Sequence, residues 1–296
     1  MYNVRDLMFL YALTSTHVGS GDNLNYIDLP IQREKHTNLP KIEASSLKGS
    51  IKQAMGQSDD VHAILGSDDD GEIASAVSFS DAKLLFFPVK SAKGIFAYVT
   101  CPLVVKRFIS DCKMIGIMDT DTEQEECLSG QKSYIASAVK ESAIVFNEKE
   151  VVLDEYVFKV ESNAGFNRFM TKIQTQLPQR HMLANDFLSR VILLGNDDFS
   201  YFVNHSTEVI TRIKIGKAGT AENKALFTQE NLPPETILYS LLFYTNSKKD
   251  EAMSAQEVKH KFNSIFSGEI FQMGGDMTLG KGLFCKKMWI GGENER

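Results

Sequence analysis

The stretch STHVGSGDNLNYIDLPIQREKHTNLPKIEASSLKGSIKQ, residues 15–53, runs from the end of an expected strand through a long loop into an expected helix. Residues 5–17 predict the strand, and both of its faces are apolar, which is typical of a strand buried on both sides. The loop from Gly19 to Pro40 shows no periodic pattern, and connections of this length are usually functional or disordered. Asp28 lies in this loop among glycine, asparagine and proline. Its carboxylate is either part of a turn or a chemically active group, and the composition of the loop does not decide between them.

The end of the same stretch predicts a helix. Ser45 or Ser46 can cap its N-terminus, and Leu47 and Ile51 recur on one face. The two hydroxyls and the ammonium of Lys48 would lie where the backbone N–H groups and the helix dipole favour an anion. Capping is the commoner role for such serines, so this pattern alone does not establish an anion site.

The composition indicates a folded, cytoplasmic protein. The chain has 296 residues, of which 43% are hydrophobic and 24% charged, enough for a sizeable core and unlike a disordered chain. Its cysteines form no CxxC pair, which fits reduced thiols in a cytosolic protein better than a disulfide framework or a zinc site. The N-terminus lacks the features of a signal peptide, and no apolar run approaches the ~20 residues that span a bilayer.

The charge pattern leaves room for a polyanionic partner in spite of the formal net charge of −6. A basic domain is the usual footprint of nucleic-acid binding, so the negative total argues weakly against it. Between residues 31 and 56, however, basic side chains outnumber acidic ones, whereas acids crowd residues 59–72 and 119–126. Separate basic and acidic sectors would allow the protein to bind a polyanion on one side only.

Hydrophobic patterns further along the chain predict a mixture of strands and helices. AVSFSDAKLLFFPV and GIFAYVTCP predict strands joined by a turn, residues 101–115 a helix, and residues 150–160 a strand. Residues 119–147 are polar and irregular, and residues 162–191 are mainly helical in pattern, with a break at Pro178. ETILYSLLFYT predicts a strand, SAQEVKHKFNSIF an amphipathic helix and GLFCKKMWI a final strand. Because strands and helices mix with several hairpins, the expected fold class is α+β.

The C-terminal segment GGDMTLGKG, residues 274–282, partly matches a phosphate-binding loop. The match fails because the residue after Lys281 must be Ser or Thr and is Gly282, and because the following LFCKKMW predicts a strand instead of a helix. Such a glycine loop still allows backbone N–H groups to approach a nucleic-acid backbone. A plain hairpin turn is an equally good interpretation of the spacing.

The segment from Val209 to Gln229 predicts a basic β-hairpin, with Arg212 and Lys214 on its first strand. A protruding basic hairpin suits insertion beside a nucleic-acid strand, although lysines also discourage edge pairing on an ordinary solvated hairpin. His17 at the expected strand end is a possible acid or base, but lone histidines are more often structural. The histidines show no metal-ligand spacing, so the sequence predicts no metal motif.

Several segments together resemble a known family. These are STHVGSG, IDLPIQREKHTNLPKIEASSLKGS, AVSFSDAKLLFFPVKSAKGIFAYVTCPL, ALFTQENLPPETILY and GGDMTLGKGLF. In this order they are similar to the Cmr-type RAMP superfamily, and within it to the backbone subunit of type III-B CRISPR effector complexes. The resemblance covers nearly the whole chain and is weakest over residues 119–205. It implies one RAMP domain over residues 1–296, with a modified RRM-like (ferredoxin-like) palm, inserted segments near 20–40 and 119–205, and a thumb-like β-hairpin near 207–230.

The resemblance also implies a function. Such subunits polymerise head to tail along a guide CRISPR RNA, together with other subunits of the complex, and cleave complementary single-stranded target RNA at regular intervals. The family's catalytic aspartate, in the loop after the first strand, matches Asp28, and we expect His17 to assist it. Cleavage by attack of the ribose 2′-OH would need a divalent ion, Mg²⁺ or Mn²⁺, which no recognisable protein motif holds. The expected RNA-binding residues are Ser45, Ser46, Lys48, Gly274, Gly275, Thr278, Gly280, Lys281 and Gly282, with Arg212 and Lys214 on the thumb.

Two other functions stay open at this point. The chain could be a non-catalytic scaffold that binds RNA as a filament while another subunit cuts. It could also be a guide-processing ribonuclease that cuts hairpin RNA alone and uses His17.

Overall fold

The computed structural model describes residues 4–22, 26–67, 73–118, 127–128, 135–138, 142–147, 149–178, 186–215, 221–247 and 253–289. The strands described are β1 Val4–Ala12, β2 Lys41–Ile42, β3 Val77–Phe79, β4 Ala82–Ser91, β5 Ile95–Thr100, β6 Ile135–Ala138, β7 Val145–Phe146, β8 Glu150–Leu153, β9 Tyr156–Ser162, β10 Val191–Leu193, β11 Glu208–Ile215, β12 Ala221–Asn231, β13 Ile237–Tyr244, β14 Ile270–Gln272 and β15 Leu283–Trp289. The helices described are α1 Ala44–Met55, α2 Asp59–Leu65, α3 Pro102–Met114, α5 Ala164–Gln176, α6 Phe187–Arg190, α7 Asn196–His205, α8 Ala255–Ile265 and the short 3₁₀ helix η2 Met277–Leu279.

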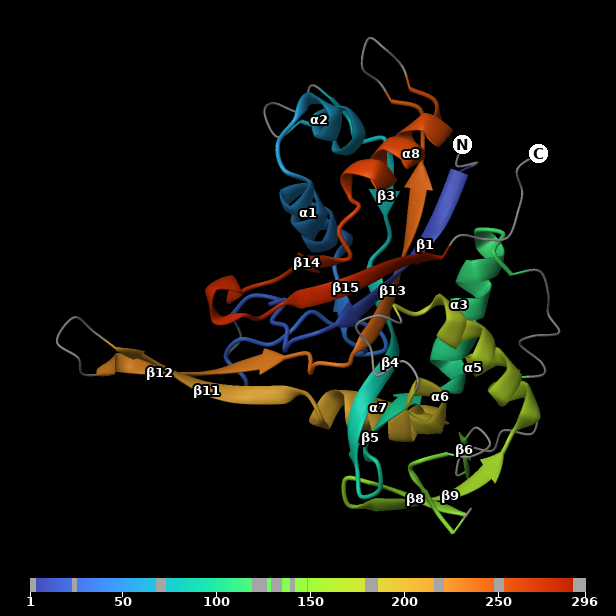
Figure 1. The fold of residues 1–296 in the computed structure, drawn as a ribbon. Coiled ribbons are helices and arrows are strands. Elements are labelled where there is room, and N and C mark those ends of the chain that lie inside the picture. The colour runs from blue at the N-terminus through green and yellow to red at the C-terminus, as the bar shows by residue number, and fades with distance from the viewer. Residues whose placement is uncertain are drawn as a thin grey trace.

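The large sheet is built around β1, which pairs antiparallel with β13 on one side and β15 on the other. The sheet continues past β15 to β14, and past β13 to the hairpin of β4 and β5. Further strands extend it to the β8–β9 hairpin (Figure 1). Strands mix with helices without regular alternation, so the expected α+β class is confirmed.

Two hydrophobic cores cover the two faces of β1. Leu7, Phe9 and Tyr11 belong to one core, together with residues from α3, α5, α6 and α7. Met8 and Leu10 belong to the other core, together with residues from α1, α2 and α8. Figure 1 shows these two groups of helices in different parts of the molecule. The sequence prediction of a strand with two apolar faces is therefore confirmed.

The hairpin of β11 and β12 forms a sheet of its own and projects from the body of the molecule (Figure 1). We call it the thumb. Its tip, residues 216–220, lies outside the described residues. The hairpin predicted from Val209 to Gln229 is confirmed, and β12 extends two residues further, to Asn231.

Three local expectations were wrong. The first strand ends at Ala12, so His17 lies five residues beyond it, in a segment where Thr16 forms an isolated bridge with Leu232. Residues 150–160 form the β8–β9 hairpin instead of one strand, because Asp154 adopts a positive φ of 49° between them. Neither Ser45 nor Ser46 caps α1, because the helix already begins at Ala44, with Glu43 at the N-cap position, and the N–H of Ala44 donates to Oδ1 of Asp81, 2.9 Å away.

The remaining predicted elements are largely confirmed. The helix over 101–115, the strand ETILYSLLFYT, the helix SAQEVKHKFNSIF and the final strand correspond to α3, β13, α8 and β15. Over residues 119–147, expected to be irregular, the described part includes β6 and β7. No helix among the described residues is both long and apolar enough to cross a membrane.

Candidate functional site

Asp28 is held by the thumb. Its Oδ2 accepts hydrogen bonds from the backbone N–H of Thr228 at 2.7 Å and from the Thr228 hydroxyl at 2.8 Å. The same hydroxyl accepts the N–H of Asp28 at 3.0 Å. Next to this pair, the N–H of Leu29 donates to the Thr228 carbonyl, and the Leu29 carbonyl accepts the N–H of Glu230. The Asp28 loop is thus fixed to the root of β12 while Asp28 itself stays exposed.

These hydrogen bonds keep the Asp28 carboxylate ionised. The backbone N–H and then the hydroxyl of Thr228 stabilise the charged form, and they lower the pKa of Asp28 below its usual range. An exposed, ionised carboxylate at a fixed position can accept a hydrogen bond from a ribose hydroxyl or bind a cation. Its low pKa makes it a weak proton acceptor near neutral pH.

His17 binds the same strand two residues further on. Its Nδ1 lies 2.7 Å from the Glu230 carbonyl, and because a carbonyl only accepts, Nδ1 carries the proton. In the neutral ring Nε2 is then the acceptor. The carbonyl of His17 in turn accepts the N–H of Gly275 at 2.9 Å. The structure therefore connects both expected catalytic residues to β12, and connects His17 to the glycine loop.

The glycine loop, residues 274–282, contacts the thumb through Asp276. Arg212 donates from Nη1 to both carboxylate oxygens of Asp276, at 2.7 and 2.8 Å, and Gln229 Nε2 donates to Oδ2 at 2.7 Å. Lys281 Nζ donates to Oδ1 of Asn231 at 3.0 Å. Burial would raise the pKa of Asp276, but the hydrogen bonds from Arg212 and Gln229 and the nearby positive charges outweigh it and hold the pKa below its usual range. Two residues expected to bind RNA, Arg212 and Lys281, thus also join the loop to the thumb.

The backbone conformation of this loop requires glycine at two positions. Gly274 has a φ of +90°, and a Cβ there would lie 2.5 Å from the His17 carbonyl oxygen. Gly282 has a φ of +75°, and a Cβ there would lie 2.1 Å from the Met273 carbonyl oxygen. The N–H groups of Gly275, Gly280 and Gly282 donate to carbonyls within the chain. The exposed hydroxyl-bearing residue of the loop is Thr278. These glycines therefore shape a tight loop that packs against His17.

The start of α1 lies next to the same loop system. Gln32 donates from Nε2 to Ser46 Oγ at 3.3 Å and to the Gly19 carbonyl at 3.2 Å, and its Oε1 accepts the N–H of Glu43. Ser45 is exposed and Lys48 is half-buried. Of the predicted RNA-binding residues of α1, Ser46 is thus joined to the Asp28 loop through Gln32. The side chain of Lys214 lies outside the described residues.

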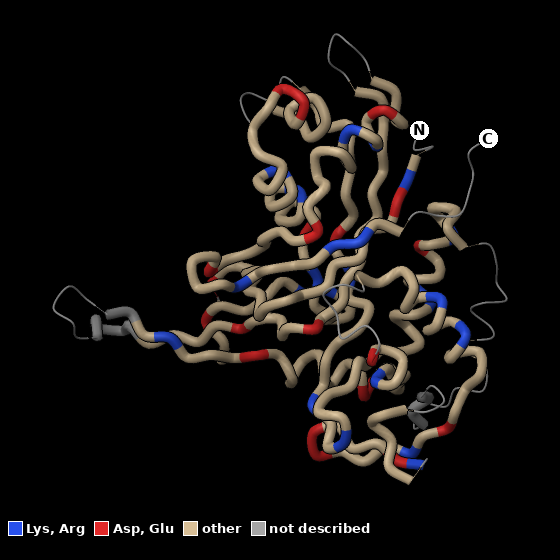
Figure 2. Tube along the Cα trace, in the orientation of Figure 1, with Lys and Arg blue, Asp and Glu red and all other residues tan. Residues whose placement is uncertain are grey.

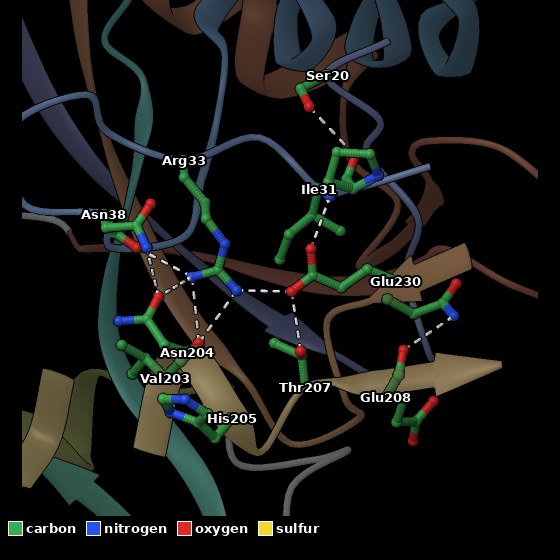
Figure 3. Close-up of polar contacts among 12 residues, drawn as sticks. Ser20, Ile31, Arg33, Asn38, Val203, Asn204, His205, Thr207, Glu208 and Glu230 are labelled. Atoms are coloured by element: carbon green, nitrogen blue, oxygen red, sulfur yellow. Dashed lines mark hydrogen bonds and ion pairs between the residues drawn. The ribbon is translucent and has the colours of Figure 1, made fainter. Parts of the chain in front are cut away.

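The contacts of β12 were not expected from the sequence. Thr228 and Glu230 bind the Asp28 loop, whereas Gln229 and Asn231 bind the glycine loop, because side chains alternate between the faces of a strand. Glu230 accepts the N–H of Ile31 at 3.0 Å (Figure 3). Gln229, Glu230 and Asn231 are only 2%, 2% and 0% exposed. The signal that could have identified them is the polar run TQEN between two apolar segments, ALF and LPPETILY.

The basic sector is largely used within the chain. Arg33 pairs with Glu230, Lys41 with Asp81 and Glu43, and Lys52 donates to the Gly66 carbonyl. Figure 2 accordingly shows blue and red segments close together over much of the body, with blue segments on α1 and red on α2. Of the acidic sectors, residues 68–72 and 119–126 lie outside the described residues. Separation of charge along the sequence thus does not translate directly into a free basic face.

A protein-family model matches this chain. The model of the RAMP superfamily matches residues 9–285, most of the chain. The chain belongs to the RAMP superfamily.

Curated relatives of this RAMP protein match over almost their full length. It is 36% identical to the CRISPR system Cmr endoribonuclease Cmr4 of Pyrococcus furiosus, over 94% of this chain and 93% of the relative. It is 28% identical to the CRISPR system CMR subunit Cmr4 of Saccharolobus solfataricus, over 93% of each chain. The resemblance to Cmr-type RAMP proteins seen in the sequence is therefore confirmed.

Solved structures confirm the modified RRM-like RAMP fold. The crystal structure of oligomeric Cmr4 from Pyrococcus furiosus has a TM-score of 0.74 and 29% identity, covering 96% of this chain and 98% of that chain. A chain of the type III-B Cmr-beta complex bound to cognate target RNA has a TM-score of 0.74 at 23% identity, covering 97% of this chain and 98% of that chain. The second likeness shows the fold alone.

Proposed function

We propose that this RAMP protein is the guide-binding backbone subunit of a type III-B CRISPR effector complex, and that it cleaves complementary target RNA at regular intervals. The observation that carries the proposal is the exposed, ionised carboxylate of Asp28 on a loop hydrogen-bonded to the root of the thumb. The name of the 36% identical relative, an endoribonuclease of the Cmr system, supports the activity. The oligomeric crystal structure at 29% identity supports assembly of copies of the chain with one another.

In this mechanism Asp28 orients the nucleophile. The ribose 2′-OH of the target strand attacks the adjacent phosphate and displaces the 5′-oxygen of the next nucleotide, so that a 2′,3′-cyclic phosphate and a 5′-hydroxyl form. The carboxylate accepts a hydrogen bond from the attacking hydroxyl, whose proton passes to solvent while the leaving oxygen takes one up. Because the pKa of Asp28 is low, alignment contributes more than proton removal. The thumb would displace a base of the guide–target duplex and so turn the scissile phosphate into line with its own 2′-OH. Cleavage then depends on the assembled complex, which sets the geometry of the RNA.

His17 would assist from its position beside Glu230 of β12. With its Nδ1 proton donated to the Glu230 carbonyl, its neutral ring presents Nε2 as the proton acceptor. This arrangement suits a group that accepts or returns a proton at the reacting oxygens. It equally suits a histidine that only supports the glycine loop, and the variant His17→Ala in an assembled complex separates the two roles.

A divalent ion fits this site only in combination with RNA. No cluster of three or more His, Cys, Asp or Glu side chains that could hold a metal occurs among the described residues. Mg²⁺ is commonly bound by one or two carboxylates together with substrate phosphates and water, and Asp28 provides one exposed carboxylate. Asp28 would thus hold Mg²⁺ or Mn²⁺ jointly with the target RNA. The bound ion would neutralise charge on the scissile phosphate.

The guide would lie along the start of α1 and the glycine loop. Ser45, Ser46 and Lys48 are candidates for phosphate contacts on α1, and Thr278 and Lys281 are candidates on the loop. The proposal places the protein in the cytoplasm, where CRISPR effectors act on RNA. Its four cysteines are free and buried, as expected for a protein with reduced thiols.

The test is an effector complex assembled on a guide RNA with the variant Asp28→Ala. We expect normal assembly and a cleavage rate reduced by a factor of about 10² or more, the scale of the loss when a reacting group is no longer aligned. Asp22→Ala is the matched control, because Asp22 is an exposed carboxylate of the same loop. Cleavage at regular spacing by the Asp28→Ala complex would show that Asp28 is not catalytic. A wild-type complex that binds target RNA without cutting it would favour the scaffold function, and cleavage of hairpin RNA by the isolated chain would favour guide processing.

A further inference from the structure

Arg33, in the Asp28 loop, donates five side-chain hydrogen bonds (Figure 3). Its Nη2 pairs with Oε1 of Glu230 at 2.6 Å, and both terminal nitrogens donate to the Val203 carbonyl at 3.2 Å. Nη1 also donates to Oδ1 of Asn204 at 3.0 Å and to the Asn38 carbonyl at 2.9 Å. The side chain is 15% exposed and that of Glu230 3%. The guanidinium thus joins three separate segments in a largely buried setting.

Those three segments meet at the root of the thumb. Arg33 belongs to the Asp28 loop, Glu230 to β12, and Val203 and Asn204 to the last turn of α7. The chain passes from α7 into β11 within a few residues, and in this connection Thr207 donates its hydroxyl to Oε1 of Glu230 at 2.8 Å. Both strands of the thumb and the Asp28 loop therefore contact the Arg33–Glu230 pair directly or through one residue.

Arginine is the residue that this geometry requires. A planar guanidinium can donate to a carboxylate, a carbonyl and an amide oxygen in different directions at once, whereas a lysine ammonium on a flexible stem cannot reproduce that fork. The carbonyl end of a helix also carries partial negative charge, which favours a cation beside Val203. The other carboxylate oxygen of Glu230, Oε2, accepts the N–H of Ile31, which lies three residues from Asp28.

We propose that Arg33 is a positioning residue for target cleavage. By joining the Asp28 loop to Glu230 and α7, it fixes the position of the Asp28 carboxylate relative to the thumb, and so its distance from the target strand beside the displaced base. This inference rests on the proposed function of Asp28. A shift of about 1 Å in a reacting group can cost about a hundredfold in rate, so loss of this connection acts on the chemical step without removing a contact to RNA.

Arg107 on α3 provides a matched control. It donates from Nη1 to Oε2 of Glu34 at 2.9 Å and also pairs from Nη2 with the other carboxylate oxygen, so it holds the residue next to Arg33. Its side chain is 28% exposed. It connects the loop to the body of the protein but not to the thumb. If Arg33 only stabilised the loop, substitution of either arginine would have similar consequences.

The experiment compares effector complexes containing wild-type chain, Arg33→Ala, Arg33→Lys, Arg107→Ala and Asp28→Ala. Single-turnover cleavage of a complementary RNA, affinity for that RNA and the thermal midpoint of each isolated chain are measured. We expect Arg33→Ala to cut about 10–100-fold more slowly with unchanged affinity for target, and Arg33→Lys, which keeps the charge, to cut about tenfold more slowly. The Arg107→Ala complex should cut within about twofold of the wild-type rate, even if the thermal midpoint of the Arg107→Ala chain falls as far as that of the Arg33→Ala chain.

Chemical rescue gives a second readout that a merely structural role would not move. Methylguanidinium added to the assembled Arg33→Ala complex should restore cleavage several-fold, and should leave the Asp28→Ala and Arg107→Ala complexes unchanged. Wild-type rates for both Arg33 variants would overturn the inference, as would equal rate losses for Arg33→Ala and Arg107→Ala without rescue. Regular cleavage by Asp28→Ala would instead overturn the proposed function, so the two failures are distinguishable.

Discussion

Thr228 and Asp28 are 200 positions apart in the sequence and exchange hydrogen bonds through one hydroxyl and two backbone N–H groups. The Thr228 hydroxyl both accepts from the Asp28 backbone and donates to its carboxylate. A single residue of the thumb, through its backbone N–H and its hydroxyl, therefore holds the candidate catalytic carboxylate and favours its charged form. The effect of Thr228 on the pKa of Asp28 can be measured in the isolated chain, without RNA.

We expect Thr228→Val to raise the pKa of Asp28. Valine has nearly the same shape as threonine but loses the hydroxyl, and the backbone N–H, the larger cause of the low pKa, remains, so the rise is partial. The low pKa means that these contacts favour the folded chain above the pKa of an unfolded aspartate, about 3.9, and lose that effect as the pH falls through the folded-state pKa. A carbon-13 NMR titration of the Asp28 carboxyl in the isolated chain measures the shift. Thr228→Ser keeps the hydroxyl, so the pKa of Asp28 should equal that in the wild-type chain. A wild-type pKa of Asp28 in Thr228→Val would contradict the hydrogen bond from the Thr228 hydroxyl.

The sequence identified Asp28 as a candidate but gave it no partner. Its loop had the composition of a turn, and only the resemblance to the RAMP superfamily favoured a catalytic carboxylate. Thr228, Glu230 and Arg33 escaped notice because their contacts with the loop join residues far apart in the chain. Local patterns report capping and periodicity, and they carry no information on which distant strand approaches a loop.

At the scale of elements, β12 connects the two loops of the candidate site. Its predicted extent was nearly right, because β-rich runs flank a glycine-containing tip, and lysines suggested a solvated hairpin. The buried polar residues at the root of β12 cannot be explained by this hairpin pattern. They lie where the hairpin leaves the body, and each face of the strand meets a loop whose backbone and side chains need hydrogen-bond partners.

Asp276→Asn tests the contact between β12 and the glycine loop. Asparagine tolerates the positive φ of 59° at this position, so the substitution removes the charge that pairs with Arg212 and keeps the backbone. We expect a loss of about 1–3 kcal/mol in the free energy of unfolding at pH 7, the scale for hydrogen bonds to charged groups. Urea unfolding of both chains at pH 7 and pH 3.5 measures it.

The loss in the free energy of unfolding caused by Asp276→Asn should depend on pH. Because the folded-state pKa of Asp276 is lowered, its contribution is present above the unfolded pKa of about 3.9 and is lost as the pH falls through the folded value. The difference between wild type and Asp276→Asn should therefore narrow below about pH 4. Asp22→Asn, at an exposed position, should stay within about 0.5 kcal/mol of wild type at both pH values. A difference that persists undiminished at pH 3.5 would exclude the ion pair as its source.

At the scale of the whole molecule, β1 and β13 supply both hydrophobic cores. Alternate residues of β13 follow the pattern of β1, with Tyr239 and Leu241 in one core and Leu238 and Leu242 in the other. The sequence predicted two apolar faces for the first strand from its unbroken hydrophobic run. It did not predict the neighbours of that strand, because β13 and β15 lie more than two hundred residues away and many strands would satisfy the same pattern.

Shared strands predict that the two cores unfold together. Phe262 on α8 is fully buried in the core of α1, α2 and α8, whereas Trp289, the one tryptophan of the chain, is packed against Phe9 and Phe108 in the other core. Phe262→Ala should lower the free energy of unfolding by about 3–5 kcal/mol. Because neither core can persist once β1 and β13 separate, the urea midpoint reported by Trp289 fluorescence should fall with the midpoint reported by circular dichroism. Phe108→Ala, next to Trp289, is the matched variant and should move both midpoints similarly. If Phe262→Ala shifted the circular dichroism and left the Trp289 transition in place, the two cores would be separate cooperative units, and the shared sheet would not couple them.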